Sequence, residues 1–399
     1  MEFRTPGVFI EEIPGGRRTI AGVDTSITAF IGRALQGPVN EPVEIRGLVD
    51  FEREFGGLWP DSYLGYAVRD FFANGGSHAV VVRLYRVGTG AANSAGSALE
   101  APDFIGPGKA EAQQGLYALD KARAFQLLCI PPHGVSVDLE PALIAAAAAY
   151  CEKRRVFLLL DPPRAWVDVN SARSGMLAGV GATSPNAAIY FPRLMQPNPL
   201  RGNQAEPFPP CGAVAGVYAR IDARRGVWKA PAGTEATIEG VVKPAVSLAD
   251  AGIDALGGLG VNCLRALPGP GCVVWGARTL QGGTASNPEW KYIPVRRLAL
   301  FVEESIDRGT QWAVFEPNGE PLWAQIRSAV DGFLLGLFRQ GAFAGNKPED
   351  AYFVRCGRDT MTQNDIDSGA VNLMVGIAPL RPAEFTIFRT RLSARPPGA

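Results

Sequence analysis

One of the two histidines in the sequence, His133, lies four residues after Cys129, and a thiol beside an imidazole can act as a nucleophile and its base. Both residues belong to the end of the apolar run AFQLLCIPPH, and active sites of parallel sheets commonly lie where such strands end. Two prolines separate the pair, however, and Cys129 stands inside the apolar run. The pattern therefore favours a buried structural cysteine beside a loop histidine over a catalytic pair.

Acidic residues offer two further candidates for chemistry. Asp161 directly follows the apolar run VFLLL at a predicted strand end, where a single carboxylate more often caps a turn or a helix. Glu303 and Glu304 are neighbours in a helical pattern, and neighbouring helix residues point about 100° apart, so they do not face a common substrate. Glu304 precedes Arg308 by four residues, a spacing that predicts an ion pair on a helix surface.

The usual cofactor and metal motifs are missing from the sequence. It contains neither G-x-x-x-x-G-K-[ST] nor G-x-S-x-G, and GMLAGVGATS lacks the final glycine of a dinucleotide motif and does not follow a strand. No group of histidines and cysteines has the spacing of metal ligands. We therefore predict no catalytic residues, no cofactor and no metal. The alternative is a soluble α/β enzyme of the hydrolase type that uses His133 or Asp161.

Composition narrows the function classes further. The 399 residues carry 39 basic and 39 acidic side chains, so the basic excess typical of nucleic-acid binders is missing. Six scattered cysteines without a C-x-x-C pattern predict reduced thiols in a protein made in the cytoplasm. Charged residues interrupt the first segment, and no run of about 18 apolar residues occurs, so we expect a soluble protein without a signal peptide or a membrane insertion.

Hydrophobic patterning predicts a mixed α/β fold in several parts. Residues 25–87 read as strand, helix, helix and strand, and an alanine-rich helix at 139–151 lies between two apolar strands. Residues 88–115 are rich in Gly, Ala and Ser and predict a flexible surface connection. The last third contains two amphipathic helices. The second, at 321–340, has one apolar face that is formed by Leu322, Ile326, Val330, Phe333 and Leu337.

Several stretches, taken in order, resemble the contractile tail sheath family, which forms the sheaths of contractile phages, R-type pyocins and phage-like injection particles. They are TPGVFIEEI, TSITAFIGRALQGPVNEPV, DFEREFGG, YAVRDFFANGGSHAVVVRL, GVYARIDARRGVWKAPAG, VWGARTL, YIPVRRLALFVEESIDRGTQWAVFEPN and GIAPLRPAEFTIF. The matches extend from about residue 5 to residue 388 and so cover nearly the whole chain. Extra domains that larger phage sheaths insert after the first strand–helix–helix–strand block are missing here, so the chain is similar to the compact sheaths of pyocins and extracellular injection systems.

This resemblance implies a structural subunit that polymerises as stacked hexameric rings around an inner tube. The sheath would contract without nucleotide hydrolysis and drive the tube through a target envelope. An outer domain would occupy residues 25–270 and an inner, tube-facing domain residues 271–380. Residues 1–24 and 381–399 would be extended arms, each donating a strand that completes a sheet in a neighbouring subunit. Pairing of these strands within one chain is the alternative.

Particular residues follow from the resemblance as candidates for assembly. Gly7, Gly15 and Gly16 would be hinges of the first arm. The candidate tube contacts are Arg327, Asp331, Arg339, Asp365 and Asp367. The exchanged strands would contain Val8, Phe9, Ile10, Glu11, Glu12, Ile13, Glu384, Phe385, Thr386, Ile387 and Phe388.

The implied partners are other proteins of the same particle. They are further copies of the chain, the inner tube protein, baseplate and terminal cap proteins, and sheath paralogues where a particle has them. Nucleic acid is not among them. The expected location is an assembled phage tail or a phage-tail-like particle, including particles released from the cell.

Overall fold

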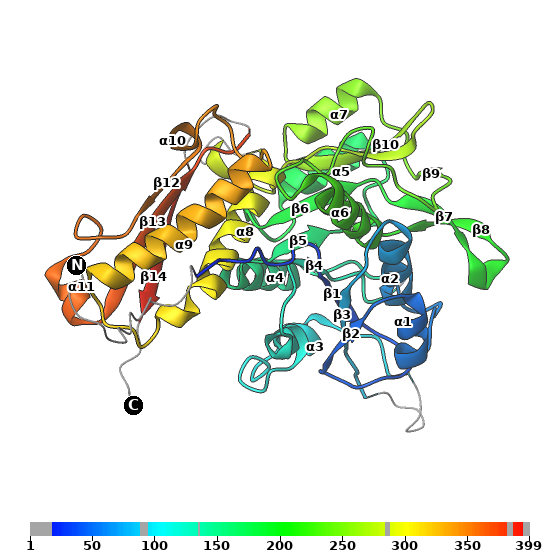
Figure 1. Ribbon diagram of the computed structural model, residues 1–399. Helices are drawn as coiled ribbons and strands as arrows, with labels where there is room; N and C mark the ends of the chain where they lie inside the picture. Colours follow the sequence, from blue (N-terminus) through cyan, green and yellow to red (C-terminus); the bar gives the residue numbers. More distant parts are fainter. Residues whose placement is uncertain (1–17, 88–94, 135, 284–287, 381–385, 394–399) are drawn as a thin grey trace, which may run out of the picture. The chain divides into compact units, whose positions relative to one another are not determined.

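The computed structural model describes residues 18–87, 95–134, 136–283 and 288–380, and the backbone of 386–393. The chain forms two compact units (Figure 1). The large unit contains residues 23–301 and 380–382, and the small unit contains residues 302–379 together with segments from both ends of the chain. The division falls inside one helix, α8, which spans Ile293–Gly309.

An eight-stranded sheet forms the centre of the large unit, in the order β11-β10-β6-β5-β4-β1-β3-β2. Neighbouring strands from β3 through β10 are parallel, whereas β2 and β11 pair antiparallel at the two edges. The strands are β1 Thr28–Gly32, β2 Pro42–Ile45, β3 Ala79–Arg83, β4 Leu127–Cys129, β5 Phe157–Leu160, β6 Ala187–Phe191, β10 Val261–Leu267 and β11 Gly271–Trp275.

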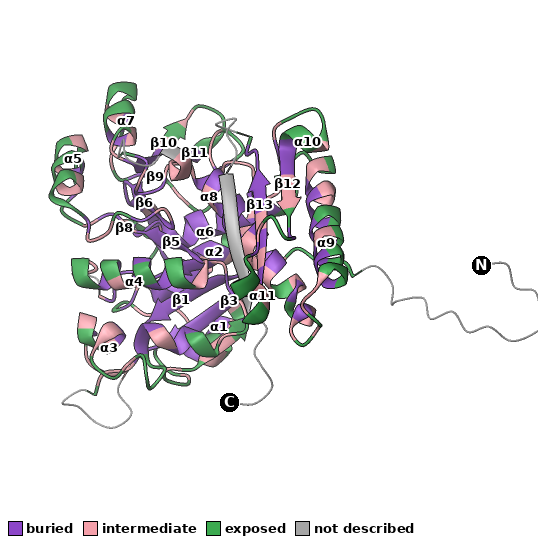
Figure 2. Cartoon of the chain, turned by 90° about the vertical axis from the view of Figure 1, so that its left-hand side faces the viewer, coloured by how far each residue is buried: buried purple, intermediate pink, exposed green. Residues whose placement is uncertain are grey.

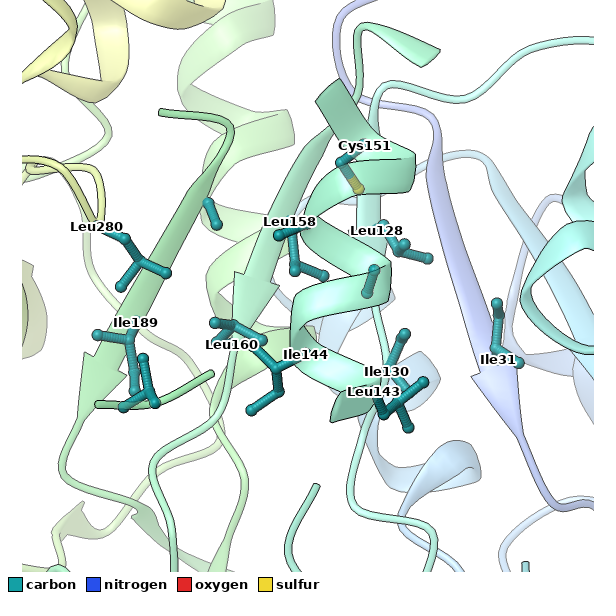
Figure 3. Close-up of a cluster of buried hydrophobic side chains, with 14 of the residues drawn as sticks. Ile31, Leu128, Ile130, Leu143, Ile144, Cys151, Leu158, Leu160, Ile189 and Leu280 are labelled. Atoms are coloured by element: carbon teal, nitrogen blue, oxygen red, sulfur yellow. The ribbon is translucent and has the colours of Figure 1, made fainter. Parts of the chain in front are cut away.

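Helices cover both faces of this sheet, because the central strands are apolar on both sides. One face packs against α1 Leu48–Phe55, α2 Leu64–Ala73 and α6 Cys211–Arg225. The other face packs against α3 Ala101–Ile105, η1 Gly115–Lys121, α4 Pro141–Arg154, α5 Val169–Ala178 and α7 Asp250–Gly257. Figure 2 shows the buried strands in purple and the exposed side of α4 in green. In Figure 3, Ile144 of α4 lies near Leu160 of β5, and Leu143 of α4 lies near Ile130.

A small three-stranded sheet, in the order β8-β7-β9, lies beyond the end of β6. Its strands are β7 Leu194–Asn198, β8 Gln204–Phe208 and β9 Lys243–Pro244, with the short turn η2 Pro199–Arg201 between the first two.

The small unit contains a second three-stranded antiparallel sheet, in the order β12-β13-β14. The small unit also contains the second half of α8 and the turn η4 Gln311–Ala313. The turn η3 Pro288–Trp290 precedes α8 and belongs to the large unit. The remaining elements are α9 Glu320–Arg339, α10 Pro348–Ala351, β12 Tyr352–Arg355, α11 Gln363–Asp367, β13 Ala370–Ile377 and β14 Thr386–Ser393. All five residues predicted for the apolar face of the 321–340 helix are buried in α9, which confirms that face.

Two features differ from the expectations. Residues 88–115 were expected to form a flexible surface connection, but Leu99 and Phe104 within them are 2% and 0% exposed and belong to the core beneath α4. Two large apolar side chains thus anchor the described part of this stretch, residues 95–115, and α3 begins with a capping box of Glu100 and Asp103. The expected boundary at 270/271 would separate β10 from β11, which form one antiparallel hairpin of the large unit.

A buried ion pair joins α8 to α6 within the large unit. The Arg297 guanidinium donates to both carboxylate oxygens of Asp222, at 2.9 and 2.6 Å, and also to the carbonyl oxygen of Thr25 at 2.9 Å. The two charged side chains are only 3% and 2% exposed, and the guanidinium lies 4.7 Å from the centroid of the Tyr218 ring. A buried pair of this kind depends on both partners, because either charge alone would be left without water or a counter-ion.

We expect Asp222→Ala to lower the free energy of unfolding by about 3–5 kcal/mol, because it leaves the Arg297 charge buried and unpaired. Urea unfolding of the unassembled subunit, followed by tryptophan fluorescence, measures this loss. Glu235→Ala is the matched control: it breaks an ion pair of similar length, 2.7 Å, whose side chains are about half exposed. We expect the control to cost less than about 1 kcal/mol, and equal losses in the two variants would contradict the prediction.

Candidate functional site

The carboxyl ends of the parallel strands hold the residues that the sequence singled out for chemistry. His133 follows β4 and is 1% exposed, and neither of its ring nitrogens has a hydrogen-bond partner. Its Nε2 lies 3.7 Å from Glu140 Oε1, and its ring packs 5.6 Å from that of Phe104, centroid to centroid. Burial lowers the pKa of His133 and outweighs the opposing effect of Glu140, so the neutral imidazole is favoured.

The structure does not make a catalytic pair of Cys129 and His133. Cys129 is fully buried in β4, and its thiol donates to the carbonyl oxygen of Cys211 at 3.6 Å, on the side of the sheet that α6 covers. His133 instead packs against Phe104 of α3, which covers the opposite face of the sheet. The two side chains thus have separate surroundings, and the reading of Cys129 as a buried structural cysteine is confirmed.

Asp161 caps a helix. Its Oδ1 accepts a hydrogen bond of 2.7 Å from the backbone N–H of Cys211, the first residue of α6, while its Oδ2 is buried without a partner. Desolvation raises the pKa of Asp161 to about 6, although the bond from Cys211 and the charge of Arg193 act in the opposite direction. The sequence-based reading of this carboxylate as a cap is confirmed.

A cavity of about 630 Å³ opens near these strand ends, but it does not include either candidate residue. Its walls come from the start of α2, the loop around Trp166 and the β7–β8 hairpin, and they combine aromatic rings with Arg164, Arg193 and Arg201. Neither His133 nor Asp161 lines it. Asp161 borders a separate space of about 190 Å³ whose walls are mostly proline, glycine and aliphatic side chains. The geometry therefore gives no support to an enzyme that uses these two residues.

Metal and acid–base chemistry find equally little support. Among the described residues, no group of three or more histidine, cysteine, aspartate or glutamate side chains could hold a metal ion. Glu304 forms the expected ion pair with Arg308, at 2.7 Å.

In the described part of the chain, no helix is long and apolar enough to cross a bilayer.

The open edges of the small unit's sheet are the second candidate site. In the described residues β12 forms one edge and β14 the other, with β13 between them. Thr386, Ile387 and Phe388 of β14 pair in register with Ile377, Gly376 and Val375 of β13 in the same chain. The remaining residues named for strand exchange, and the three hinge glycines, lie outside the described residues.

A groove of about 430 Å³ runs between α9 and the edge strand β12. Arg327, Ser328 and Asp331 line it from the helix, and Tyr352 and Phe353 line it from the strand. Desolvation, followed by the neighbouring Asp331 carboxylate, raises the pKa of Tyr352 to about 12. The groove therefore places the edge strand β12 beside apolar and charged side chains.

The predicted tube contacts all lie in the small unit, and several have structural tasks there. Arg327 donates to Glu320 at 2.6 Å and to the carbonyl oxygen of Cys356. Asp365 forms the capping box of α11 with Thr362, and Asp367 accepts a hydrogen bond of 2.8 Å from Gln363. Asp331 and Arg339 are exposed on α9, and Asp331 also interacts with Tyr352.

Comparison with known proteins identifies the family. The family model for the phage tail sheath protein central domain matches residues 106–280, and the model for the phage tail sheath C-terminal domain matches residues 285–393. The chain belongs to the phage tail sheath protein family. The resemblance seen in the sequence is thereby confirmed.

Relatives in this tail sheath family span very different lengths. A prophage major tail sheath protein of Pseudomonas aeruginosa (strain UCBPP-PA14) is 25% identical over 401 residues, which cover 97% of this chain and 96% of that relative. The tail sheath protein of Vibrio phage KVP40 is 32% identical over 130 residues, and these make up 32% of this chain but only 19% of the phage protein.

Solved sheath structures match this member of the tail sheath family over almost its whole length. The anti-feeding prophage helical sheath in its contracted state is 30% identical, with a TM-score of 0.72, and the match covers 97% of this chain and 99% of that one. The sheath complex of an extracellular contractile injection system, PVC, in its contracted state is 29% identical, with a TM-score of 0.74 and 98% coverage of both chains.

The raised pKa of Asp161 predicts a pH-dependent stability. Because its pKa rises from 3.8 unfolded to about 6 folded, its contribution to folding is fully present below about pH 4 and is lost as the pH rises to about 6. Asp161→Asn lacks this loss, so the variant should gain stability relative to the wild type between pH 4 and pH 6.5. The gain should be on the order of 2 kcal/mol, since one pKa unit corresponds to about 1.4 kcal/mol.

Urea unfolding at a series of pH values measures this difference. Asp254→Asn, at an exposed position of α7, is the matched control for removing a carboxylate from the large unit. A difference between Asp161→Asn and wild type that stays constant from pH 4 to pH 6.5 would contradict the assignment.

Proposed function

We propose that this chain is the structural subunit of a contractile sheath, and not an enzyme. The observation that carries this proposal is the near-complete match to sheath subunits in contracted particles, 97% of this chain and 99% of the anti-feeding prophage sheath chain. The subunits would form stacked hexameric rings around an inner tube, end at a baseplate and a terminal cap, and assemble in the cytoplasm into a phage-tail-like particle. A structure containing a chain similar to this one, the anti-feeding prophage baseplate, supports the baseplate partner.

Strand exchange through the small unit would link the rings. The strand formed by residues 8–13 of one copy would add to an open edge of the β12-β13-β14 sheet of another, and β14 would pair with β13 of a neighbour in the register that it has here within one chain. Adding a strand to a sheet edge satisfies backbone groups that are otherwise unpaired. The edge formed by β12 is the better candidate to receive such a strand, because a groove lined by apolar and charged side chains lies between it and α9.

The energy for contraction would come from contacts between subunits. A strand of about six residues can form about 4–6 backbone hydrogen bonds, each worth roughly 0.5–1.5 kcal/mol net, so one link is modest but a full lattice is strong. The links would persist while the rings rotate and compress from a kinetically trapped extended state to a better-packed contracted one. Such a relaxation needs no nucleotide.

The small unit would face the tube. Arg339 is the strongest of the five predicted contacts, because it is exposed on α9. Asp331 is also exposed there but interacts with Tyr352, and Arg327, Asp365 and Asp367 make hydrogen bonds within their own unit.

Exchange of β14 predicts a covalent ladder. Asn372 and Arg391 are register partners across β13 and β14, so the double variant Asn372→Cys and Arg391→Cys should form a disulfide there. If neighbours exchange the strand, oxidised particles should give chains linked to one another on a non-reducing gel. The six native cysteines are buried, which keeps the background low.

The matched control for this cross-link is Arg355→Cys with Met374→Cys, register partners across β12 and β13. Both strands stay in one chain under either arrangement, so this pair should give only internally linked monomers. Monomers alone from the β13–β14 pair in assembled particles would overturn the exchange of β14.

Electron microscopy after co-expression with the inner tube protein tests the function itself. The full chain should form hollow, striated cylinders. Deletion of residues 1–15 should abolish the cylinders but leave a folded subunit with an unchanged circular dichroism spectrum, because the large unit has its own core. Small uniform particles from the full chain would contradict the sheath proposal.

A further inference from the structure

Phe315 has an exposed aromatic side chain and a strained backbone conformation. Its side chain is 77% exposed, and its φ of +81° lies in the left-handed region that bulky residues rarely adopt. It stands in the loop between α8, which ends at Gly309, and α9, which begins at Glu320. Glycine or asparagine would form the same turn with less strain and without exposing an aromatic ring.

Hydrogen bonds and burial fix the loop on both sides of Phe315. Before it, the Thr310 hydroxyl donates to the carbonyl oxygen of Ile306 at 2.7 Å, and Ala313 is 6% exposed. After it, the Asn318 amide donates to the carbonyl oxygens of Ile366 and Ala370, at 3.2 and 3.3 Å. The exposed ring is therefore held at a defined place on the small unit rather than at the tip of an untethered loop.

The first described residues of the N-terminal segment hold the same loop. The Arg18 guanidinium lies 4.0 Å from the centroid of the Trp312 ring and 3.2 Å from the Glu316 carboxylate, so it joins the two sides of the turn that displays Phe315. Two residues later, Ile20 is 8% exposed and packs on Gly309, where a Cβ would lie 2.6 Å from its Cγ2. The base of the N-terminal arm and the Phe315 loop thus form one surface.

We propose that this surface, made of Arg18, Trp312, Phe315 and Glu316, docks on a second copy of the chain, with Phe315 as its buried anchor. Aromatic side chains that enter a desolvated contact are the commonest anchors of protein interfaces. The second copy is the partner because Arg18 lies in the N-terminal arm, residues 1–24, whose first part the proposed function sends to a neighbour, so the two contacts would be continuous. The inference rests on that proposed function.

The test compares Phe315→Gly with the full chain. The substitution removes the ring and allows the positive φ, so the unassembled subunit should unfold at the same or a higher urea concentration. Assembly, measured as the concentration at which polymers sediment with and without tube protein, should need at least ten times more protein. Val49→Ala is the matched control: it removes an apolar side chain of α1 that is 73% exposed, and assembly should be unchanged.

Photo-crosslinking identifies the partner directly. With Phe315→p-benzoylphenylalanine, irradiated particles should give sheath–sheath dimers. Crosslinks to the tube protein alone, or polymers from Phe315→Gly at the wild-type concentration, would overturn the inference and leave the sheath function intact. Failure of the wild-type chain to polymerise in the same assay would instead reject the proposed function on which the inference rests.

Discussion

The large unit is organised around a charge that cannot reach water. Burial by itself would lower the pKa of Arg297, but the Asp222 carboxylate and its hydrogen bonds more than offset this, so the pKa is raised and the guanidinium stays charged. Its donors are distributed between Asp222 of α6 and the Thr25 carbonyl just before β1, and its face lies over Tyr218. Since an unpaired buried charge is very unfavourable, the start of β1, the helix α6 and the first half of α8 are bound to one arrangement.

The eight-stranded sheet of the large unit and the β12-β13-β14 sheet of the small unit differ in how their edges are protected. In the large unit, the parallel strands are closed on each side by an antiparallel strand that is short or has exposed ends, β2 and β11. In the small unit, only β13 is an inner strand, whereas β12 and β14 are both edge strands in the described residues, and β12 borders a groove. A sheet so small gains more from an added strand than the large sheet would, because three strands barely suffice for independent stability. This difference supports the proposal that subunits are linked through the small unit.

How much the sequence foretold depends on the range of the interaction. The helices α8 and α9 were predicted because their apolar residues recur with a period of 3.6, a pattern that neighbouring turns of the sequence show directly. The core role of Phe104 was missed, since its neighbours are mostly small or polar and only the tertiary fold brings α4 over it. The pair of Asp222 and Arg297 was missed for the same reason: 75 positions separate two residues that look like ordinary helix-surface charges. The positions of His133 and Asp161 at strand ends were predicted correctly, because parallel strands align their ends. Their roles could not be predicted, because these depend on the residues that the fold packs around them.

Those roles explain how a doubly wound sheet can hold residues suited to chemistry without a coherent catalytic site. The carboxyl edge of the sheet is where enzymes of this architecture place their reacting groups. Here Asp161 holds the first N–H of α6, His133 is enclosed beside Phe104, and Cys129 is covered by α6. Each group is thus engaged in packing or capping. Burial raises the pKa of Asp161 and lowers the pKa of His133, and both shifts favour the neutral form of the side chain. A fold of this class permits catalysis but does not require it. When the strand ends are occupied by structural contacts, the function has to be sought on surfaces that remain open. In the described residues these surfaces include the edges of the small sheet and the exposed ring of Phe315.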